Sequence, residues 1–345
     1  MTTEEALADL LKSRRIEDRI RAVQGLAGTN SATGQALLLQ ALHDRTPYVA
    51  ALAAEALGQR AGEDAALAMT ERFLTLMEDG LRRDPGCHIR ANLAFAFGRL
   101  EYTPAAEALR QGIRAVQIEP VGGVPFDTAA HLRANCALAL AQIHAPDALR
   151  DITLLLFDHG TDAPGAGDIR HIKVEPRKAA ARALARLAVP DSVVPLALRL
   201  TYPAGETAEV LQECMLAVVA LEDPRALELL EPYLKHEDSH LAAYAALMIA
   251  QTQAPEAPAL IRMVVGRLSG DPLQAAMLAL ATLRSEEGRA ALLELAGDAR
   301  EAVRLAAAQA LAGAQDALSR KKLADLAAHD RSAAVRRTAE RALAG

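Results

Sequence analysis

A segment that recurs ten times along the chain constrains the fold more than any other feature of the sequence. The clearest copies start with an aliphatic residue and reach a second apolar residue eight positions later, as in VAALAAEALG from Val49 and IRANLAFAFG from Ile89. Weaker copies keep the second apolar residue. The second apolar residue of successive copies stands at positions 26, 57, 97, 140, 184, 219, 249, 280, 311 and 343. The interval is 31 residues at first, rises to 44 in the middle and settles at 30 to 32. This pattern is typical of a stack of repeated units with central insertions.

The apolar positions within each copy fall at 0, +4, +7 and +8, the spacing of one helical face. Second amphipathic stretches lie between the copies, at residues 4–11, 35–42, 226–234 and 320–330. Each repeat is therefore predicted to be a pair of antiparallel helices. We predict an all-α, right-handed α-solenoid of about ten helix-turn-helix repeats, one domain over residues 1–345, with no β-sheet.

An aspartate stands six residues before an arginine in four copies of the segment. The pairs are Asp84 with Arg90, Asp127 with Arg133, Asp298 with Arg304, and Asp330 with Arg336. Together with the Ala-Leu-Gly that closes several copies, this pattern resembles the HEAT repeat family over essentially the whole chain. In HEAT proteins such side chains form a ladder between adjacent repeats, so the resemblance implies a structural role for these residues.

The ladder is expected to break in the middle of the chain. His171 stands where the aspartate before Arg177 would be, and Gln212 and Ala242 replace arginine in the next two repeats.

Two insertions, at about residues 117–131 and 158–176, are rich in Gly, Pro and Asp and are predicted to be long loops between helices. Neither contains the glycine-rich run followed by Lys-Ser or Lys-Thr that cradles phosphate. Long loops in a compact array either carry function or are neutral insertions, and both readings stay open.

The segment His236-Glu237-Asp238-Ser239-His240 matches the H-E-x-x-H zinc pattern. The repeat register places His236 at the end of one helix and His240 at the start of the next, so the two imidazoles need not share a face. No third ligand is indicated. The three cysteines lie far apart and form no C-x-x-C pair. We therefore predict no metal and no cofactor.

The resemblance also brings in HEAT-like enzymes. Deoxyhypusine hydroxylase uses several His-Glu dipeptides, whereas this chain has one, at residues 236–237. HEAT-like alkylpurine DNA glycosylases depend on aromatic residues that include Trp, and this chain has no Trp and only 3% aromatic residues. No motif decides for or against the bilin lyases of phycobilisome assembly, so a bilin-lyase-like protein stays an alternative. The prediction is that the chain is not an enzyme.

Positions +6 and +10 of the second helix point away from the first helix, at about 100° per residue. In three central repeats they are Phe95, Arg99, Leu138, Gln142, Arg182 and Arg186. Phe95 and Leu138 are then large apolar groups on a face that should otherwise be polar. We expect an apolar floor with a charged rim, as in a partner-binding groove. The alternative is that these side chains pack laterally against the next helix.

Lys178, Arg182 and Arg186 stand four residues apart and line one helical face of the basic segment 170–199. The acidic segment 206–238 follows it. Two readings of these charges stay open. The two segments attract each other across neighbouring repeats, or the basic segment is a docking site for an acidic protein segment or nucleic acid.

We predict a non-enzymatic scaffold or adaptor that holds a protein partner on its concave face; the alternative partner is nucleic acid. The net charge of 38 − 44 = −6 argues against a chain devoted to binding polyphosphate. The amino-terminal MTTEEALADLLKSRR carries acids where a signal peptide is basic, and no run of about 18 apolar residues occurs. A cytoplasmic protein without membrane partners is expected.

Overall fold

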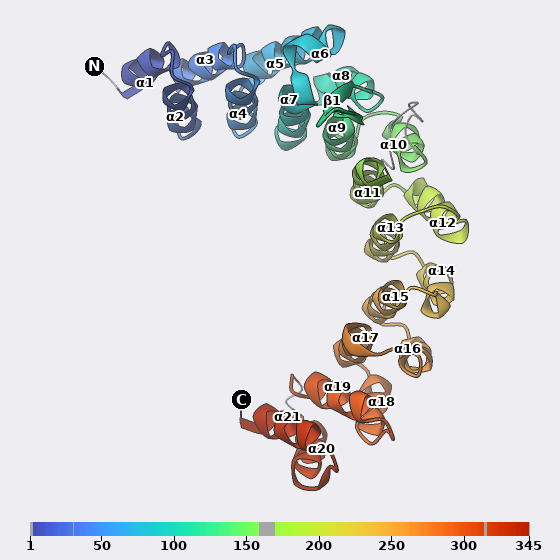
Figure 1. The fold of residues 1–345 in the computed structure, drawn as a ribbon. Coiled ribbons are helices and arrows are strands. Elements are labelled where there is room, and N and C mark those ends of the chain that lie inside the picture. The colour runs from blue at the N-terminus through green and yellow to red at the C-terminus, as the bar shows by residue number, and fades with distance from the viewer. Residues whose placement is uncertain (1–2, 30, 159–169, 314–315, 345) are drawn as a thin grey trace. The chain divides into compact units, whose positions relative to one another are not determined.

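The computed structural model describes residues 3–29, 31–158, 170–313 and 316–344, with only the backbone for residues 170–173. It divides into two compact units, unit 1 over Met1–Pro195 and unit 2 over Leu196–Gly345, and each is considered by itself. Helices dominate both units (Figure 1). A single domain over residues 1–345 stays a prediction.

Unit 1 contains the elements α1 (Thr3–Leu11), α2 (Ile16–Ala27), α3 (Ala32–Ala41), α4 (Pro47–Leu57), α5 (Glu63–Glu78), α6 (Gly80–Arg83), η1 (Pro85–Cys87), α7 (His88–Arg99), η2 (Thr103–Ala105), α8 (Ala106–Gly112), β1 (Ile118–Val121), β2 (Val124–Asp127), α9 (Ala130–Gln142), α10 (Ala148–Leu156), α11 (Arg170–Leu187) and η3 (Pro190–Ser192). Helix α12 (Val193–Thr201) crosses the boundary. Unit 2 contains α13 (Ala208–Ala220), α14 (Ala226–Leu230), η4 (Glu231–Lys235), α15 (Ser239–Gln251), α16 (Ala257–Val265), α17 (Gly270–Thr282), α18 (Glu286–Leu295), α19 (Glu301–Leu311), α20 (Ala317–His329) and α21 (Ala333–Ala344). The elements labelled η are short 3-10 helices.

Each unit is a stack of helix pairs, which confirms the predicted all-α repeat architecture. In unit 1 the second helices α2, α4, α7, α9 and α11 pack one on the next, and the first helices form a layer beside them (Figure 1). In unit 2 the helices α13, α15, α17, α19 and α21 pack in the same way. The number of repeats and the hand of the solenoid stay predictions.

Alanine and glycine let the second helices of unit 1 approach closely. A Cβ added to Gly58 would lie 2.6 Å from the Cβ of Ala96 on the neighbouring helix. The side-chain amide of Asn92 donates to the carbonyl of Ala51 on α4 at 2.9 Å. Asn135 on α9 repeats this bond to α7, also at 2.9 Å, so α4, α7 and α9 are joined by matching hydrogen bonds.

The first insertion is not the predicted loop, and the expectation of no β-sheet was wrong. Within residues 117–131 the strands β1 and β2 form an antiparallel hairpin around Gly122 and Gly123, both at positive φ. A Gly-Gly pair between two short strands is a strong hairpin signal. Pro120 and Pro125, which suggested a loop, are paired with each other, one step away from the turn. Opposite residues in an antiparallel ladder alternate between hydrogen-bonded and non-hydrogen-bonded pairs, and this pair is a non-hydrogen-bonded one. The strands therefore tolerate two residues that lack a backbone N–H.

The second insertion, predicted as a loop over residues 158–176, is partly helical. Residues 159–169 lie outside the described residues, and α11 already begins at Arg170. Pro176 therefore lies inside the helix, where its missing N–H removes one backbone hydrogen bond without ending the helix.

Candidate binding groove

A groove lies in unit 1 between the carboxyl-terminal halves of α7 and α9 and reaches α11. Its volume is about 310 Å³. Its lining residues are Phe95, Gly98, Arg99, Asn135, Leu138, Ala139, Gln142 and Arg186. Five of the seven residues predicted to bind a partner lie in this lining; the structure does not place Lys178 and Arg182 there.

The floor of the groove is apolar because the two helices meet through small residues. A Cβ added to Gly98 would lie 3.1 Å from the Cα of Ala139, so the two helices are in tight contact here and a side chain at position 98 would push them apart slightly. Phe95 and Leu138 stand on either side of it. Phe95 keeps 46% of its surface exposed, so the neighbouring helix does not cover it as the lateral-packing alternative requires. Leu138 is half-buried.

The rim of the groove is polar and carries positive charge. The guanidinium of Arg99 lies over the ring of Phe95, 5.9 Å from its centroid. The side-chain amide of Gln142 donates to the carboxylate of Glu101 at 3.1 Å. Arg186 is exposed and forms no hydrogen bond or ion pair with any described residue. The guanidiniums of Arg99 and Arg186 are therefore available to an anionic group.

Lys178 and Arg182 lie on α11 outside the groove, where one carboxylate engages both. The Nζ of Lys178 is 3.1 Å from one Glu175 oxygen, and a guanidinium nitrogen of Arg182 is 3.4 Å from the other. All three side chains are partly exposed, so these ion pairs contribute little to stability. The sequence shows Glu175 as one of the few acids in the basic segment, but it does not show that this carboxylate engages both cations.

Two of the predicted Asp–Arg pairs form inside their own repeat. The Nε of Arg90 lies 2.9 Å from a carboxylate oxygen of Asp84, and both side chains are almost fully buried. Asp84 also accepts the backbone N–H groups of Ile89 and Arg90. Arg133 donates to Asp127 at 2.6 Å. These contacts hold the amino ends of α7 and α9, the two helices that form the groove.

A pairing between repeats occurs at Arg304, which binds the carboxylate of Asp330 and contacts Asp298 only through its backbone carbonyl, at 2.9 Å. Two guanidinium nitrogens of Arg304 meet the two oxygens of Asp330, at 2.8 and 3.1 Å. The hydrogen bond from Arg304 lowers the pKa of the Asp330 carboxyl. The Asp298 carboxylate instead accepts a hydrogen bond from the backbone N–H of Arg300. This bond is the main reason why the pKa of the Asp298 carboxyl is lowered. Arg336 donates to the backbone carbonyl of Asp330 at 2.6 Å.

The sequence prediction missed an equivalent bridge at the amino terminus. Arg19 lies 2.8 Å from the carboxylate of Asp44 in the following repeat, and both are largely buried. The six-residue rule, by which an Asp stands six residues before its Arg, does not find this pair. Six residues before Arg19 stands Ser13, and six residues after Asp44 stands Ala50. An arginine in one repeat and an aspartate at the turn of the next was the available signal.

The His236–His240 segment forms a turn and a helix cap. The ring of His236 stacks on Tyr233 with centroids 6.1 Å apart, and its Nδ1 accepts the backbone N–H of Asp238 at 3.1 Å. Asp238 in turn accepts the N–H of His240 at 2.8 Å, which caps α15. Across the described ranges, no three His, Cys, Asp or Glu side chains come together as metal ligands.

The cysteines are buried and poor nucleophiles. Burial raises the pKa of Cys87 to about 11 and raises that of Cys136 and Cys214 further. Their thiols therefore stay protonated near neutral pH. Within the part of the chain that the structure describes, no helix is long and apolar enough to cross a bilayer.

Residues 4–83 and 257–344 match the family model of HEAT repeats. No curated protein matches the chain. The crystal structure of Kap121p bound to Nup53p is similar over 99% of this chain and 41% of its own, at 12% identity with a TM-score of 0.51. This chain thus spans about two fifths of Kap121p, and the likeness is one of fold.

Two further solved structures are similar. An engineered protein has 20% identity over 100% of this chain and 98% of its own, with a TM-score of 0.44. Human deoxyhypusine hydroxylase in complex with glycerol has 17% identity over 81% of this chain and 95% of its own, with a TM-score of 0.33. The repeated helix pairs and the matched segments at both ends agree: this chain belongs to the HEAT-repeat family.

Proposed function

We propose that this chain is a non-enzymatic interaction scaffold and that the groove between α7, α9 and α11 binds a segment of a partner protein. The observation that carries the proposal is the exposed ring of Phe95 beside the unpaired guanidinium of Arg186, around a cavity of about 310 Å³. An aromatic anchor ringed by polar groups is the usual composition of an energetic centre in protein interfaces.

The charges and size of the groove favour an acidic segment with one large apolar residue. An aromatic side chain buries 150–250 Å², so covering the 46% of Phe95 that is exposed removes about 90 Å² from water. At 25 cal/mol per Å² this contributes about 2 kcal/mol. A carboxylate that reaches Arg186 adds about 1.5–3 kcal/mol as a charge-assisted hydrogen bond. Together these terms are about 3.5–5 kcal/mol, which alone corresponds to roughly millimolar binding, so tighter binding requires further contacts along the segment beyond those that offset the entropy of association.

The groove is better equipped for binding than for catalysis. Its described lining contains no carboxylate, histidine, cysteine or hydroxyl group, so it offers neither a general base nor a nucleophile. Nucleic acid is the alternative ligand, because phosphate would also pair with Arg99 and Arg186. Glu101 at the rim and the net charge of −6 disfavour a long polyanion.

The test starts from a random peptide library displayed against the purified full chain. The dissociation constant of an enriched peptide is then measured for the wild type and for the Phe95→Ala/Arg186→Glu variant. The matched control is Leu154→Ala/Arg150→Glu, the same two kinds of change on the exposed side of α10.

We expect enriched peptides to combine an aromatic or aliphatic residue with Asp or Glu. The Phe95→Ala/Arg186→Glu variant should bind them at least about a hundredfold more weakly, with unchanged helicity, and the control should bind as the wild type does. Unchanged binding by the Phe95/Arg186 variant would refute the site. A single-stranded oligonucleotide that binds at the same residues with a steep salt dependence would favour the nucleic-acid alternative instead.

A further inference from the structure

We propose that unit 2 carries a second docking surface, across α13, α15 and α17, that binds a basic amphipathic α-helix of a partner protein. This surface shares no residue with the groove of unit 1, and the inference does not rest on the function proposed there.

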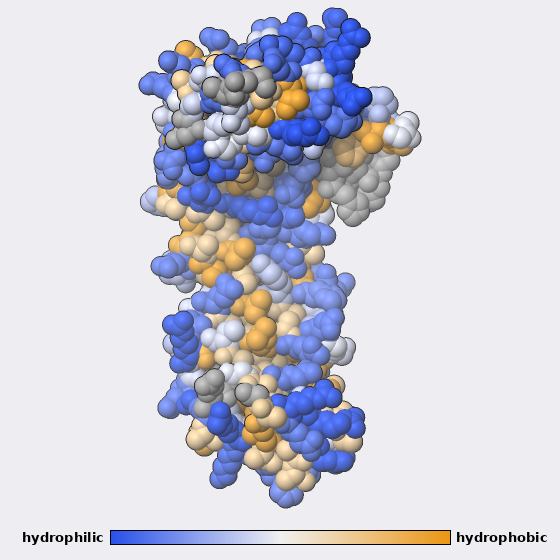
Figure 2. Space-filling model, turned by 90° about the vertical axis from the view of Figure 1, so that its left-hand side faces the viewer, coloured by the Kyte–Doolittle hydropathy of each residue, from blue (hydrophilic) through white to orange (hydrophobic). Residues whose placement is uncertain are grey.

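A row of leucines runs across the three helices. Leu216, Leu247 and Leu278 stand 31 residues apart and occupy the same position on α13, α15 and α17. Leu216 is 40% exposed and Leu278 is 54% exposed, while Leu247 is half-buried. In Figure 2 apolar side chains of unit 2 gather along the middle of the face turned to the viewer, with hydrophilic side chains at its margins. The row is therefore an apolar strip without a cover.

The spacing of the row suits a helix that lies across it. Helices α13, α15 and α17 pack directly on one another, and packed helices lie 8–10 Å apart. Seven residues of an α-helix rise about 10.5 Å. A partner helix laid across the three would therefore place residues i, i+7 and i+14 over successive leucines.

The width of the strip also favours a helix over an extended chain. Toward the amino ends, Tyr244 and Ala275 flank the row on α15 and α17, and Glu213 stands at the same position on α13. Toward the carboxyl ends, Ala220 and Ala281 flank the row on α13 and α17, and both are exposed. A helix about 10 Å across can cover such a band, whereas an extended segment covers only its centre.

The charge of the surface selects a basic partner. Helices α13, α15 and α17 contain no Lys or Arg, and their acids are Glu209, Glu213 and Asp271. Glu209 and Asp271 are exposed and stand seven residues before Leu216 and Leu278, two turns away on the same face. The opposite edge of the strip has no acid at Gln251 or Thr282, and the exposed Arg284 just after α17 adds a positive charge there. Lysines along one flank of the partner helix would therefore meet the acidic edge and fix its orientation.

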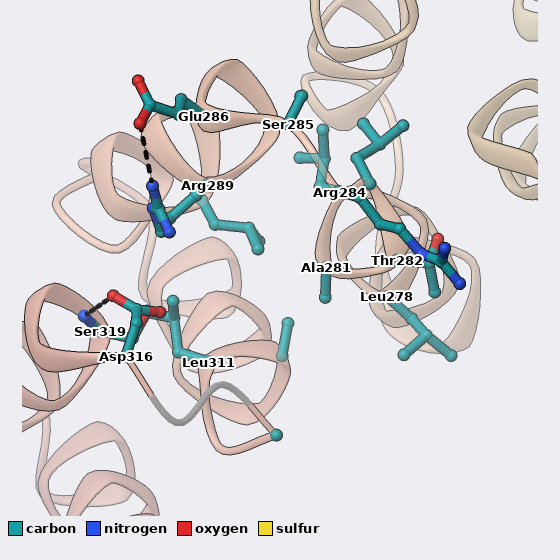
Figure 3. Close-up of a pocket in the computed structure, with 15 residues that line it drawn as sticks. Leu278, Ala281, Thr282, Arg284, Ser285, Glu286, Arg289, Leu311, Asp316 and Ser319 are labelled. Atoms are coloured by element: carbon teal, nitrogen blue, oxygen red, sulfur yellow. Dashed lines mark hydrogen bonds and ion pairs between the residues drawn. The ribbon is translucent and has the colours of Figure 1, made fainter. Parts of the chain in front are cut away.

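One end of the leucine row opens into a cavity of about 420 Å³ (Figure 3). Leu278 and Ala281 line one wall of this cavity, and Leu311 lies across from them. The charged groups on the far wall already have partners. Arg289 forms an ion pair with Glu286, and Asp316 accepts a hydrogen bond from the hydroxyl of Ser319. The wall formed by Leu278 and Ala281, with the exposed Arg284 beside it, is thus the part left for a ligand. It suits an aromatic residue at position i+14 of the partner, whose ring can lie on the leucine and under the guanidinium.

The probe is a fluorescein-labelled peptide of about 18 residues, long enough for i to i+14. It carries Leu at i and i+7, Phe at i+14 and Lys along one flank. Fluorescence anisotropy with the full chain should show micromolar binding, and circular dichroism should show a gain of helix. The control peptides are a scrambled sequence and a version with Glu in place of Lys; we expect each to bind at least about tenfold more weakly.

Variants of the protein locate the site. Leu216→Asp and Leu278→Asp should each weaken binding about tenfold or more, and Glu209→Lys with Asp271→Lys should weaken binding and flatten its salt dependence. Met263→Asp is the matched control, since Met263 is 63% exposed on α16, away from the row. The Phe95→Ala/Arg186→Glu variant should also bind the peptide normally, which separates this surface from the groove.

Three results would each overturn the proposal. They are no binding of the heptad peptide, equal binding of its scrambled form, and wild-type binding by both leucine variants with unchanged thermal melting.

Discussion

Arg90→Met should destabilise unit 1 strongly, because it leaves a buried carboxylate without its cation. Asp84 is fully buried, and the Arg90 guanidinium 2.9 Å away is the positive charge that contacts it. Removing one partner of a buried ion pair leaves the remaining charge uncompensated and costs about 3–5 kcal/mol. The same guanidinium donates to the side chain of Gln117, so the segment leading into the hairpin also loses an anchor. Met has similar length without charge, so the loss of packing is small.

A double-mutant cycle with Asp84→Asn separates the charge from the packing. In Asp84→Asn the charge is removed, while one side-chain oxygen remains to accept a hydrogen bond from the backbone N–H groups that now donate to Asp84. The double variant should be much less unstable than the sum of the two single changes, with a coupling of about 2 kcal/mol or more.

The assay is hydrogen exchange of the α7 amides in the full chain, since repeat arrays open locally and need not unfold in one step. Because 1.4 kcal/mol is a tenfold change, a loss of about 3 kcal/mol should speed exchange by more than about a hundredfold. Additive effects of the two changes, or near wild-type exchange in Arg90→Met, would refute the reasoning.

Three further predictions follow from the packing and the titrating groups. Gly58→Val should destabilise unit 1 by about 1–3 kcal/mol, measured by thermal melting, because its side chain overlaps the next helix; wild-type melting would contradict the close approach. The folded pKa of Asp330 is lowered by Arg304, so this carboxylate stabilises the fold above its unfolded pKa of about 3.9 and loses that effect as pH falls through the folded value. Asp330→Asn should therefore be less stable than wild type at neutral pH in urea unfolding and approach it in acid; a difference independent of pH would argue against the bridge. Cys136 and Cys214 should not react with a thiol reagent at mildly alkaline pH until the chain is denatured, because burial raises their pKa; rapid labelling of the native protein would show that they are accessible.

The helix pairs could be predicted from the sequence because burial of one helical face repeats with the period of the structure. The hairpin could not, because prolines normally signal the end of a strand, and only the strand register shows that Pro120 and Pro125 need no ladder N–H. Similarly, the stretch 226–234 has one amphipathic pattern, yet it divides into α14 and η4, with Pro232 just inside the 3-10 turn.

The groove could be predicted in part, because positions on a helix fix which side chains share a face. Phe95 and Leu138 come together because α7 and α9 are the second helices of consecutive repeats and pack on each other. Lys178 shares a helical face with Arg186 but lies two turns earlier on α11, and the groove reaches only Arg186. Spacing alone also does not decide which acid engages a given cation, as Glu175 engages Lys178. For the same reason the six-residue rule could not tell that Arg304 pairs with the next repeat.

The most direct test of the central claim is a photocrosslink from the floor of the groove. Benzoylphenylalanine in place of Phe95 should crosslink an enriched acidic peptide at its large apolar residue, as read by mass spectrometry. The same probe in place of Leu154 on the exposed side of α10 should give no crosslink. Efficient crosslinking at position 154 with none at position 95 would contradict the proposed binding groove.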